Sequence, residues 1–123
     1  MGTPREVFEK LSGGIGGGDW SGLHLLYAED AVVDVPFARP RAMRLRGREQ
    51  VRAHFASIGD RIVLTPRDVR VHETADPEVI IAEWDYESGA VRFANIQVLR
   101  VRDGLIVESR DYHDHAAIAE ILA

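Results

Sequence analysis

The period of the hydrophobic positions changes from about 3.6 to 2 near the middle of the chain. Before residue 60 the apolar side chains recur at helical spacing, as at Val7, Leu11 and Ile15. From Arg61 onward they alternate with polar ones, which is typical of half-buried strands. We therefore expect an α+β domain in which N-terminal helices pack on one face of an antiparallel meander.

Capping and turn residues set the bounds of these expected elements. A capping box with proline at 3–6 begins the first helix, and five glycines between Gly13 and Gly18 are expected to fray or break it. The other expected elements are a second helix from Asp19, a strand at 31–35, a loop at 37–46, a third helix at 47–59, strands near 62–74, 78–87, 90–102 and 105–114, and a helical tail at 116–122.

Composition narrows the class of protein. A chain of 123 residues that is 46% hydrophobic forms one globular domain, 1–123, and its lack of cysteine excludes disulfides and thiolate chemistry. No secretion signal and no apolar run of about 20 residues is present, so we expect a soluble, cytoplasmic protein with no membrane partner.

The net charge of −5 argues against nucleic-acid binding. The arginines between 39 and 52 either hold an anionic ligand or cover a solvated loop and helix face.

The hairpin at 98–115 carries the most specific chemistry. Asp103-Gly104 is a two-residue turn signal, so alternation places Ser109, Asp111 and His113 on one side of the last strand, after Leu105 and Val107. A face that is apolar at one end and acidic at the other suggests the mouth of a pocket.

A second two-residue turn at Ser88-Gly89 fixes how the strands at 78–87 and 90–102 pair. Together with the Asp103-Gly104 turn, it predicts which side chains share each face of the sheet. Asp85 would lie directly opposite Arg92, within reach of an ion pair. One face would carry Val79, Ile81, Ile96, Val98, Leu105 and Val107, with Glu83, Asp85, Arg92, Asp111 and His113 at its other end. The opposite face, which mixes aromatic and polar groups as a dimer contact does, would carry Trp84, Phe93, Asn95, Gln97, Leu99, Arg110 and Tyr112.

Each polar group on the pocket face has a structural alternative. Asp85–Arg92 is either a catalytic pair or a rim salt bridge, and Asp111 either contacts a ligand or accepts structural hydrogen bonds. Asp34, amid valines, either faces water on an edge strand or enters the pocket. His113 and His115 lack a carboxylate at the spacing that would complete a metal site. The other histidines, expected at the surface or the edge of the core, are His24, His54 and His72.

Three stretches, 19–36, 47–55 and 100–114, together resemble the SnoaL-like branch of the nuclear transport factor 2-like superfamily, which includes ketosteroid isomerases. The resemblance implies a cone of three N-terminal helices wrapped by a strongly bent antiparallel or mixed sheet, with one pocket and usually a dimer. It also implies that the first helix continues through the glycines. Members of the family include isomerases, polyketide cyclases, an epoxide hydrolase and non-catalytic binding proteins.

The resemblance extends to site residues only in part. Val35 stands where ketosteroid isomerases place their base, with Asp34 one residue earlier. Asp85 and Asp111 match the two carboxylates of the Asp-Arg-Asp set in limonene-epoxide-hydrolase-like members, whereas Glu83 stands at the arginine position. Asp34 also matches the residue that positions water in those enzymes.

We therefore expect a small-molecule enzyme that uses general acid–base catalysis, without cofactor or metal, on an apolar substrate. The reaction would be an isomerisation, a cyclisation or a hydration or hydrolysis. Asp85 and Asp111 are the expected acid–base carboxylates, and Asp34 is a candidate base or water holder. The expected substrate-binding residues are Arg92, His113, Glu83, Trp20, Tyr27 and Phe55. The alternatives are a non-catalytic protein that binds a small hydrophobic ligand and a homodimeric scaffold whose cavity is filled.

Overall fold

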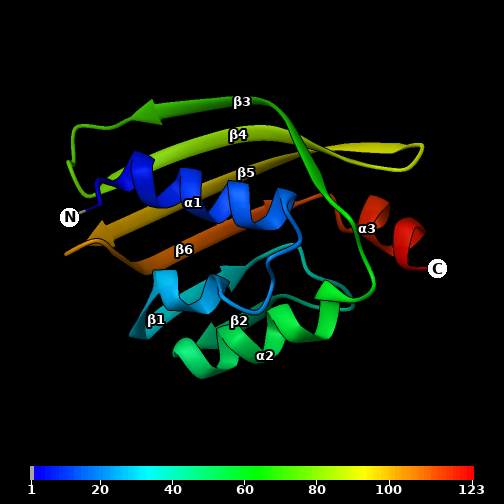
Figure 1. Ribbon diagram of the computed structural model, residues 1–123, viewed down its shortest axis with the longest axis horizontal. Helices are drawn as coiled ribbons and strands as arrows, with labels where there is room; N and C mark the ends of the chain where they lie inside the picture. Colours follow the sequence, from blue (N-terminus) through cyan, green and yellow to red (C-terminus); the bar gives the residue numbers. More distant parts are fainter. Residues whose placement is uncertain (1) are drawn as a thin grey trace.

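The computed structural model describes residues 2–123, in which helices pack against a six-stranded sheet (Figure 1). In chain order the elements are α1 (Pro4–Gly16), the 3₁₀ helix η1 (Leu23–Leu26), β1 (Tyr27–Val35), β2 (Met43–Arg46), α2 (Arg48–Gly59), β3 (Thr65–Glu73), β4 (Val79–Ser88), β5 (Val91–Arg102), β6 (Leu105–His113) and α3 (His115–Leu122). The predicted α+β class is confirmed.

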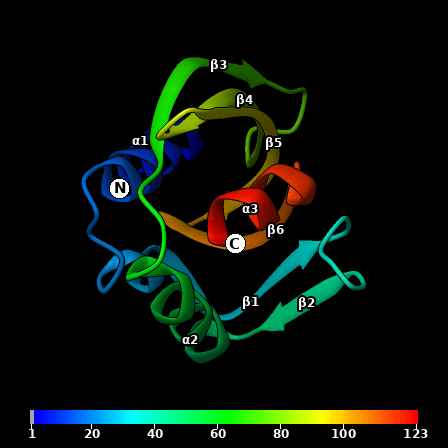
Figure 2. The same cartoon turned by 90° about the vertical axis from the view of Figure 1, so that its right-hand side faces the viewer.

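The sheet has the strand order β2-β1-β6-β5-β4-β3 and is mixed, because β1 runs parallel to β6 while the other neighbours are antiparallel. It bends strongly, so that its concave face is turned towards α1 and α2 (Figure 2). Helix α3 lies at one end of the bent sheet. The expected cone, with helices in the concave face of the sheet, is confirmed. No helix among residues 2–123 has the length and apolar character needed to cross a bilayer.

The N-terminal helices differ from the expectation based on glycine propensity. Helix α1 runs unbroken to Gly16, because its buried Val7, Phe8 and Leu11 supply packing that outweighs the weak propensity of its last turn. Gly14 lies so close to η1 that a Cβ there would be 2.4 Å from the Leu23 side chain. The glycines therefore permit close helix packing, and the predicted break is wrong.

The expected second helix shrinks to the single turn of η1, and its C-terminal part is strand. Tyr27, predicted on a helix face, begins β1 and is buried against Ile106 of β6. The predicted loop at 37–46 contains β2, whose ladder with β1 extends the sheet. Long-range strand pairing has overridden helix periodicity at Tyr27 and loop-like local sequence at 43–46.

A β-bulge in β6 decides which residues face the helices. Arg102 pairs with Leu105 across Asp103-Gly104, as predicted, and the two turn residues have φ of 52° and 76°. Beyond this turn the register shifts by one position at Val107. Such a shift turns every later side chain of the strand to the other face.

The bulge separates Asp111 from Asp85, which were predicted to share a face. Asp111 pairs with Gln97 instead of Ile96 and so faces the helices. The β4–β5 turn lies one residue later than expected, but this moves each pairing by two positions, so Asp85 still shares a face with Ala94 and Ile96, and that face is convex. The residues predicted for the pocket face that lie on the convex face are Val79, Ile81, Glu83, Asp85, Arg92, Ile96, Val98 and Leu105, whereas Trp84, Phe93, Asn95, Gln97 and Leu99 line the concave face.

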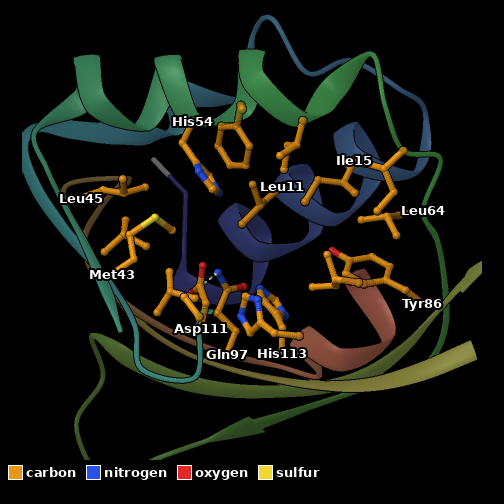
Figure 3. Close-up of a pocket in the computed structure, with 18 of the residues that line it drawn as sticks. Leu11, Ile15, Met43, Leu45, His54, Leu64, Tyr86, Gln97, Asp111 and His113 are labelled. Atoms are coloured by element: carbon orange, nitrogen blue, oxygen red, sulfur yellow. Dashed lines mark hydrogen bonds between the residues drawn. The ribbon is translucent and has the colours of Figure 1, made fainter. Parts of the chain in front are cut away.

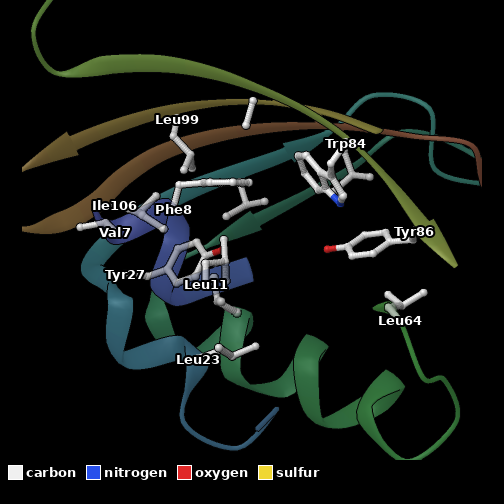
Figure 4. Packing of buried hydrophobic residues seen from close by; sticks show 14 of the residues in the cluster. Val7, Phe8, Leu11, Leu23, Tyr27, Leu64, Trp84, Tyr86, Leu99 and Ile106 are labelled. Atoms are coloured by element: carbon white, nitrogen blue, oxygen red, sulfur yellow. The ribbon is translucent and has the colours of Figure 1, made fainter. Parts of the chain in front are cut away.

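A group of deeply buried side chains lies between α1 and the sheet (Figure 4). Phe8, Tyr27, Leu99 and Ile106 are all at most 2% exposed there. Phe8 also contacts Trp84, with ring centroids 5.4 Å apart. This core fills one end of the cone and leaves the other end open as a cavity.

Candidate functional site

The open end of the cone holds a pocket of 380 Å³ between the helices and the concave face (Figure 3). This volume lies at the small end of the roughly 300–1,000 Å³ found for small-molecule sites. The wall is largely apolar and includes the predicted Trp20, Tyr27 and Phe55, whose rings are in contact. The cavity is therefore not filled by the protein's own side chains, contrary to the scaffold alternative.

Asp111 lies on the floor of the pocket and, among residues 2–123, is the one carboxylate that lines it. Its Oδ1 accepts hydrogen bonds from Ser109 Oγ at 2.5 Å and from Gln97 Nε2 at 3.0 Å. Gln97 also donates to Ser109 Oγ at 3.1 Å. These bonds fix the orientation of the carboxylate and leave Oδ2 for other partners.

His113 lies beside Asp111 and is oriented by Asn95, which is 2% exposed. The Asn95 amide nitrogen donates to the Phe93 carbonyl at 3.3 Å, so its oxygen faces His113 Nδ1 at 2.7 Å. Because an amide oxygen can only accept, Nδ1 carries the hydrogen and the neutral ring keeps Nε2 as a free acceptor. Burial lowers the pKa of His113, and the negative charge of Asp111 opposes that shift.

Two more histidines line the pocket. His54 projects from α2 towards the cavity, on the side opposite Asp111 (Figure 3). His115, at the start of α3, has its ring 6.0 Å from that of His113. Burial lowers the pKa of both imidazoles, so each is neutral at pH 7. The sequence placed His54 at the surface or the edge of the core, and its position in the pocket wall was missed.

Two hydrogen-bond donors from β4 also line the pocket. The Tyr86 hydroxyl points into the cavity (Figure 3). Burial raises the pKa of this phenol, so it stays protonated. Trp84 packs edge-on against it, with centroids 5.5 Å apart, and its buried Nε1 has no hydrogen-bond partner in the described part of the chain. Both side chains can donate to an oxygen of a bound molecule.

Four of the predicted site residues lie outside the pocket, and three of them lie on the convex face of β4 and β5. Asp85 forms an ion pair with Arg92 at 2.9 Å on the convex face, which corresponds to the salt-bridge alternative, and Arg92 also binds Asp68 at 2.5 Å. Glu83 pairs there with His72 at 2.5 Å. The convergence of Asp85 and Asp111 in one hollow is wrong, because the bulge turns the two carboxylates apart.

Asp34 also lies outside the pocket. Its carboxylate pairs with Arg44 across the β1–β2 ladder at 2.5 Å and is 26% exposed. Val33 and Val35, its neighbours in β1, are the residues that line the cavity. Of the two alternatives, Asp34 faces outward and not into the pocket, although β1 lies between β2 and β6 and is not the edge strand that was expected.

Gln97, Tyr86 and Trp84 were missed as pocket residues because the predicted register placed β4 and β5 with their faces reversed. A signal was present in the sequence. Asn95 and Gln97 alternate with the apolar residues of a central strand, where a buried polar side chain needs a specific partner. Among residues 2–123, no three potential ligands gather closely enough to hold a metal ion.

The fold and pocket define a cone-shaped α+β protein with a largely apolar cavity on the concave side of its sheet. Residues 8–109 match the family model of the SnoaL-like domain, and the chain belongs to that family. Its fold is that of the nuclear transport factor 2-like superfamily, as the resemblance implied.

Individual relatives cover most of the chain. A PhzA/B-like protein of Pseudomonas aeruginosa is 33% identical over 102 residues, which are 77% of this chain and 72% of that protein. The structure of a candidate isomerase from Bacillus subtilis has a TM-score of 0.85 at 25% identity, covering 94% of this chain and 89% of the other. That of a candidate polyketide cyclase from Xanthomonas campestris has a TM-score of 0.79 at 16% identity, covering 98% and 96%. This last likeness concerns the fold alone.

Proposed function

We propose that the protein is a cofactor-free enzyme that moves a proton on an apolar, carbonyl-containing substrate, giving an isomerisation or a ring closure. The observation that carries the proposal is the adjacent pair Asp111 and His113 on the floor of an otherwise apolar pocket. The candidate isomerase among the structural neighbours supports the same class of chemistry. A hydrolytic Asp-Arg-Asp mechanism lacks support, because Asp85 and Arg92 lie outside the pocket.

The proposed reaction begins with removal of a proton from the carbon next to the substrate carbonyl. The C–H bond breaks, its proton goes to His113 Nε2 and its electron pair forms an enolate. Asp111 stabilises the imidazolium that results, since opposite charges at short range favour the charged form. The Tyr86 hydroxyl and Trp84 Nε1–H donate to the enolate oxygen, where preorganised donors lower the barrier.

The second step determines the product. Return of the proton from His113 to a different carbon gives an isomer. Attack of the enolate carbon on a second carbonyl of the same substrate closes a ring, and the new alkoxide takes the proton. Both outcomes use the same side chains, and the substrate's shape selects between them.

Hydrogen exchange tests this proposal without knowledge of the natural substrate. We use 2-tetralone, a ketone on an apolar bicyclic body, and follow exchange of its α-protons in D2O by NMR. Exchange faster than in buffer, slowed by about 10²–10⁴ in Asp111→Asn and His113→Gln, supports acid–base catalysis. Asp85→Asn is the matched control and retains full activity.

A second candidate is a binding protein without chemistry, which the predominance of apolar wall residues favours. The same experiment separates the two. Binding of 2-tetralone, seen as a higher melting temperature, with exchange at the buffer rate contradicts the enzyme proposal and favours the binding protein.

A further inference from the structure

The rim of the pocket carries a group of polar side chains that the proposed proton transfer does not use. Arg39 comes from the segment that joins β1 and β2, and His115 begins α3; both line the cavity. These two segments lie at the same end of the molecule in both ribbon views (Figures 1 and 2). The rim is therefore formed by residues far apart in sequence.

Arg39, in the segment between β1 and β2, lines the pocket without a carboxylate partner in the described part of the chain. Arg44, Arg92, Arg100 and Arg102 are all held in ion pairs, whereas Arg39 pairs with no acidic side chain of residues 2–123. The one carboxylate in the pocket, that of Asp111, is bound on the floor by Gln97 and Ser109. Arg39 thus presents an uncompensated positive charge at the mouth of an apolar cavity.

His115 supplies a second unpartnered group at the same place. Its Nε2 is buried and has no hydrogen-bond partner in the part of the chain that the structure describes. A buried nitrogen without a partner is unfavourable, and in the tautomer that carries the hydrogen on Nε2 a ligand oxygen would satisfy it. Arg39 also contributes to lowering the pKa of His115, because its positive charge disfavours protonation of the nearby imidazole. A bound anion would therefore meet one guanidinium charge and one neutral imidazole at this place.

We propose that Arg39 and His115 form a carboxylate-binding subsite, and that the natural substrate is an amphipathic acid with an apolar, carbonyl-containing body. Guanidinium and carboxylate match in geometry and form paired hydrogen bonds. The apolar body then occupies the cavity beyond the rim, with its reacting carbon beside His113, whose ring lies next to that of His115. The inference rests on the proposed function for the reaction but not for the binding.

The test compares two ligands of nearly the same shape, 2-naphthoate and 2-naphthamide, by isothermal titration calorimetry at pH 7.5. The carboxylate is expected to bind at least about tenfold more tightly than the neutral amide. Arg39→Gln abolishes this preference while the affinity for the amide stays unchanged. Arg39→Lys retains part of it, because lysine keeps the charge without the planar pair of donors.

Two further variants make the result specific. Arg41→Gln removes a charge from an exposed residue of the same segment, outside the pocket lining, and leaves the preference intact. His115→Phe keeps an aromatic ring and reduces the preference several-fold. Melting temperatures check that each variant is folded.

The inference is overturned if the amide binds as tightly as the carboxylate, if neither ligand binds, or if Arg41→Gln has the same effect as Arg39→Gln. Its failure is distinct from failure of the proton-transfer proposal. Loss of carboxylate preference with normal exchange of 2-tetralone rejects the subsite alone. A clear preference together with exchange at the buffer rate rejects catalysis and retains the subsite.

Discussion

Gln97 and Asp111 are direct cross-strand partners on the concave face, joined by a hydrogen bond of 3.0 Å from Gln97 Nε2 to Asp111 Oδ1. This pairing exists only because of the bulge at Val107, without which Asp111 would lie opposite Ile96 and face outward. One extra residue in a strand thus converts a surface carboxylate into the single carboxylate of the described pocket lining.

The first prediction concerns Asp111 and Asp85, which lie on opposite faces of the sheet. Asp111→Asn is expected to reduce proton exchange by about 10²–10⁴, since the neutral amide cannot stabilise an imidazolium at His113. Asp85→Asn is expected to leave the rate unchanged. Circular dichroism checks the fold of both variants. Equal activity in the two variants would reject the role of Asp111.

The fold was predictable because its signals are local or repeated. The capping box at 3–6, the Asp103-Gly104 turn and the alternation after residue 61 each specify an element, and the structure contains all of them. Local sequence signals did not predict the secondary structure of segments whose conformation depends on pairing with a distant strand. Neither the strand state of Tyr27 nor the pairing of β2 with β1 can be derived from the periodicity of these segments.

The site was predictable only in part, for a geometric reason. Asp111, His113, Trp20, Tyr27 and Phe55 line the pocket as expected. The facing of Asp111 was assigned by counting from a turn, and a count of that kind fails at every bulge. The same count placed Asp85 and Arg92 inside, whereas they pair on the convex surface. No residue type in the strand marks the bulge, so structure was needed to locate it.

The second prediction concerns stability in acid. Burial lowers the pKa of His54, His113 and His115 below the usual 6.5. Below pH 6.5 the unfolded chain therefore binds more protons than the folded protein, and the free energy of unfolding falls as the pH falls towards the lowered pKa values. Urea unfolding between about pH 8 and pH 5 measures this loss.

A variant separates the histidines from the carboxylates in this experiment. His113→Gln is expected to flatten the dependence above about pH 5, because one of the groups has been removed. Glu78, whose pKa its two arginine partners hold at about 2, loses its favourable contribution only below its usual 4.5 and does not affect this range. An unchanged slope in His113→Gln would contradict the assignment.

The third prediction uses two adjacent glycines in α1. A Cβ at Gly13 meets no atom within 4 Å, so Gly13→Ala is expected to stabilise the protein by about 1 kcal/mol through helix propensity. A Cβ at Gly14 would lie 2.4 Å from Leu23, which is buried, and overpacking of this kind costs about 1–3 kcal/mol. The melting temperatures of Gly13→Ala and Gly14→Ala should therefore shift in opposite directions from that of the parent protein. A higher melting temperature in Gly14→Ala would show that η1 can move.

The fourth prediction is a proposal about assembly. Ile96 is 42% exposed near the middle of the convex face, with Ile81 and Val98 on the neighbouring positions of the same face. The family resemblance implies a dimer, and we propose that this face binds a second copy of the chain. Light scattering is expected to give twice the chain mass, and Ile96→Glu to give the monomer. Val63→Glu, at a residue 75% exposed elsewhere, is the control. A monomeric parent protein would reject the proposal.

The fifth prediction concerns Asn95, which acts on the substrate only through His113. Its amide oxygen accepts from His113 Nδ1 at 2.7 Å, so Asn95→Asp places a carboxylate at the same distance from the ring. An adjacent negative charge favours the imidazolium, and the pKa of His113 should therefore rise. If His113 is the base, the acidic limb of the pH–rate profile for 2-tetralone exchange moves to higher pH, while the rate at high pH is largely retained.

Asn95→Leu, which removes the acceptor, should instead lower the rate at every pH by releasing the ring from its orientation. NMR titration of the His113 ring protons measures the pKa directly. A profile that stays in place while that pKa rises would show that His113 is not the group that takes the proton.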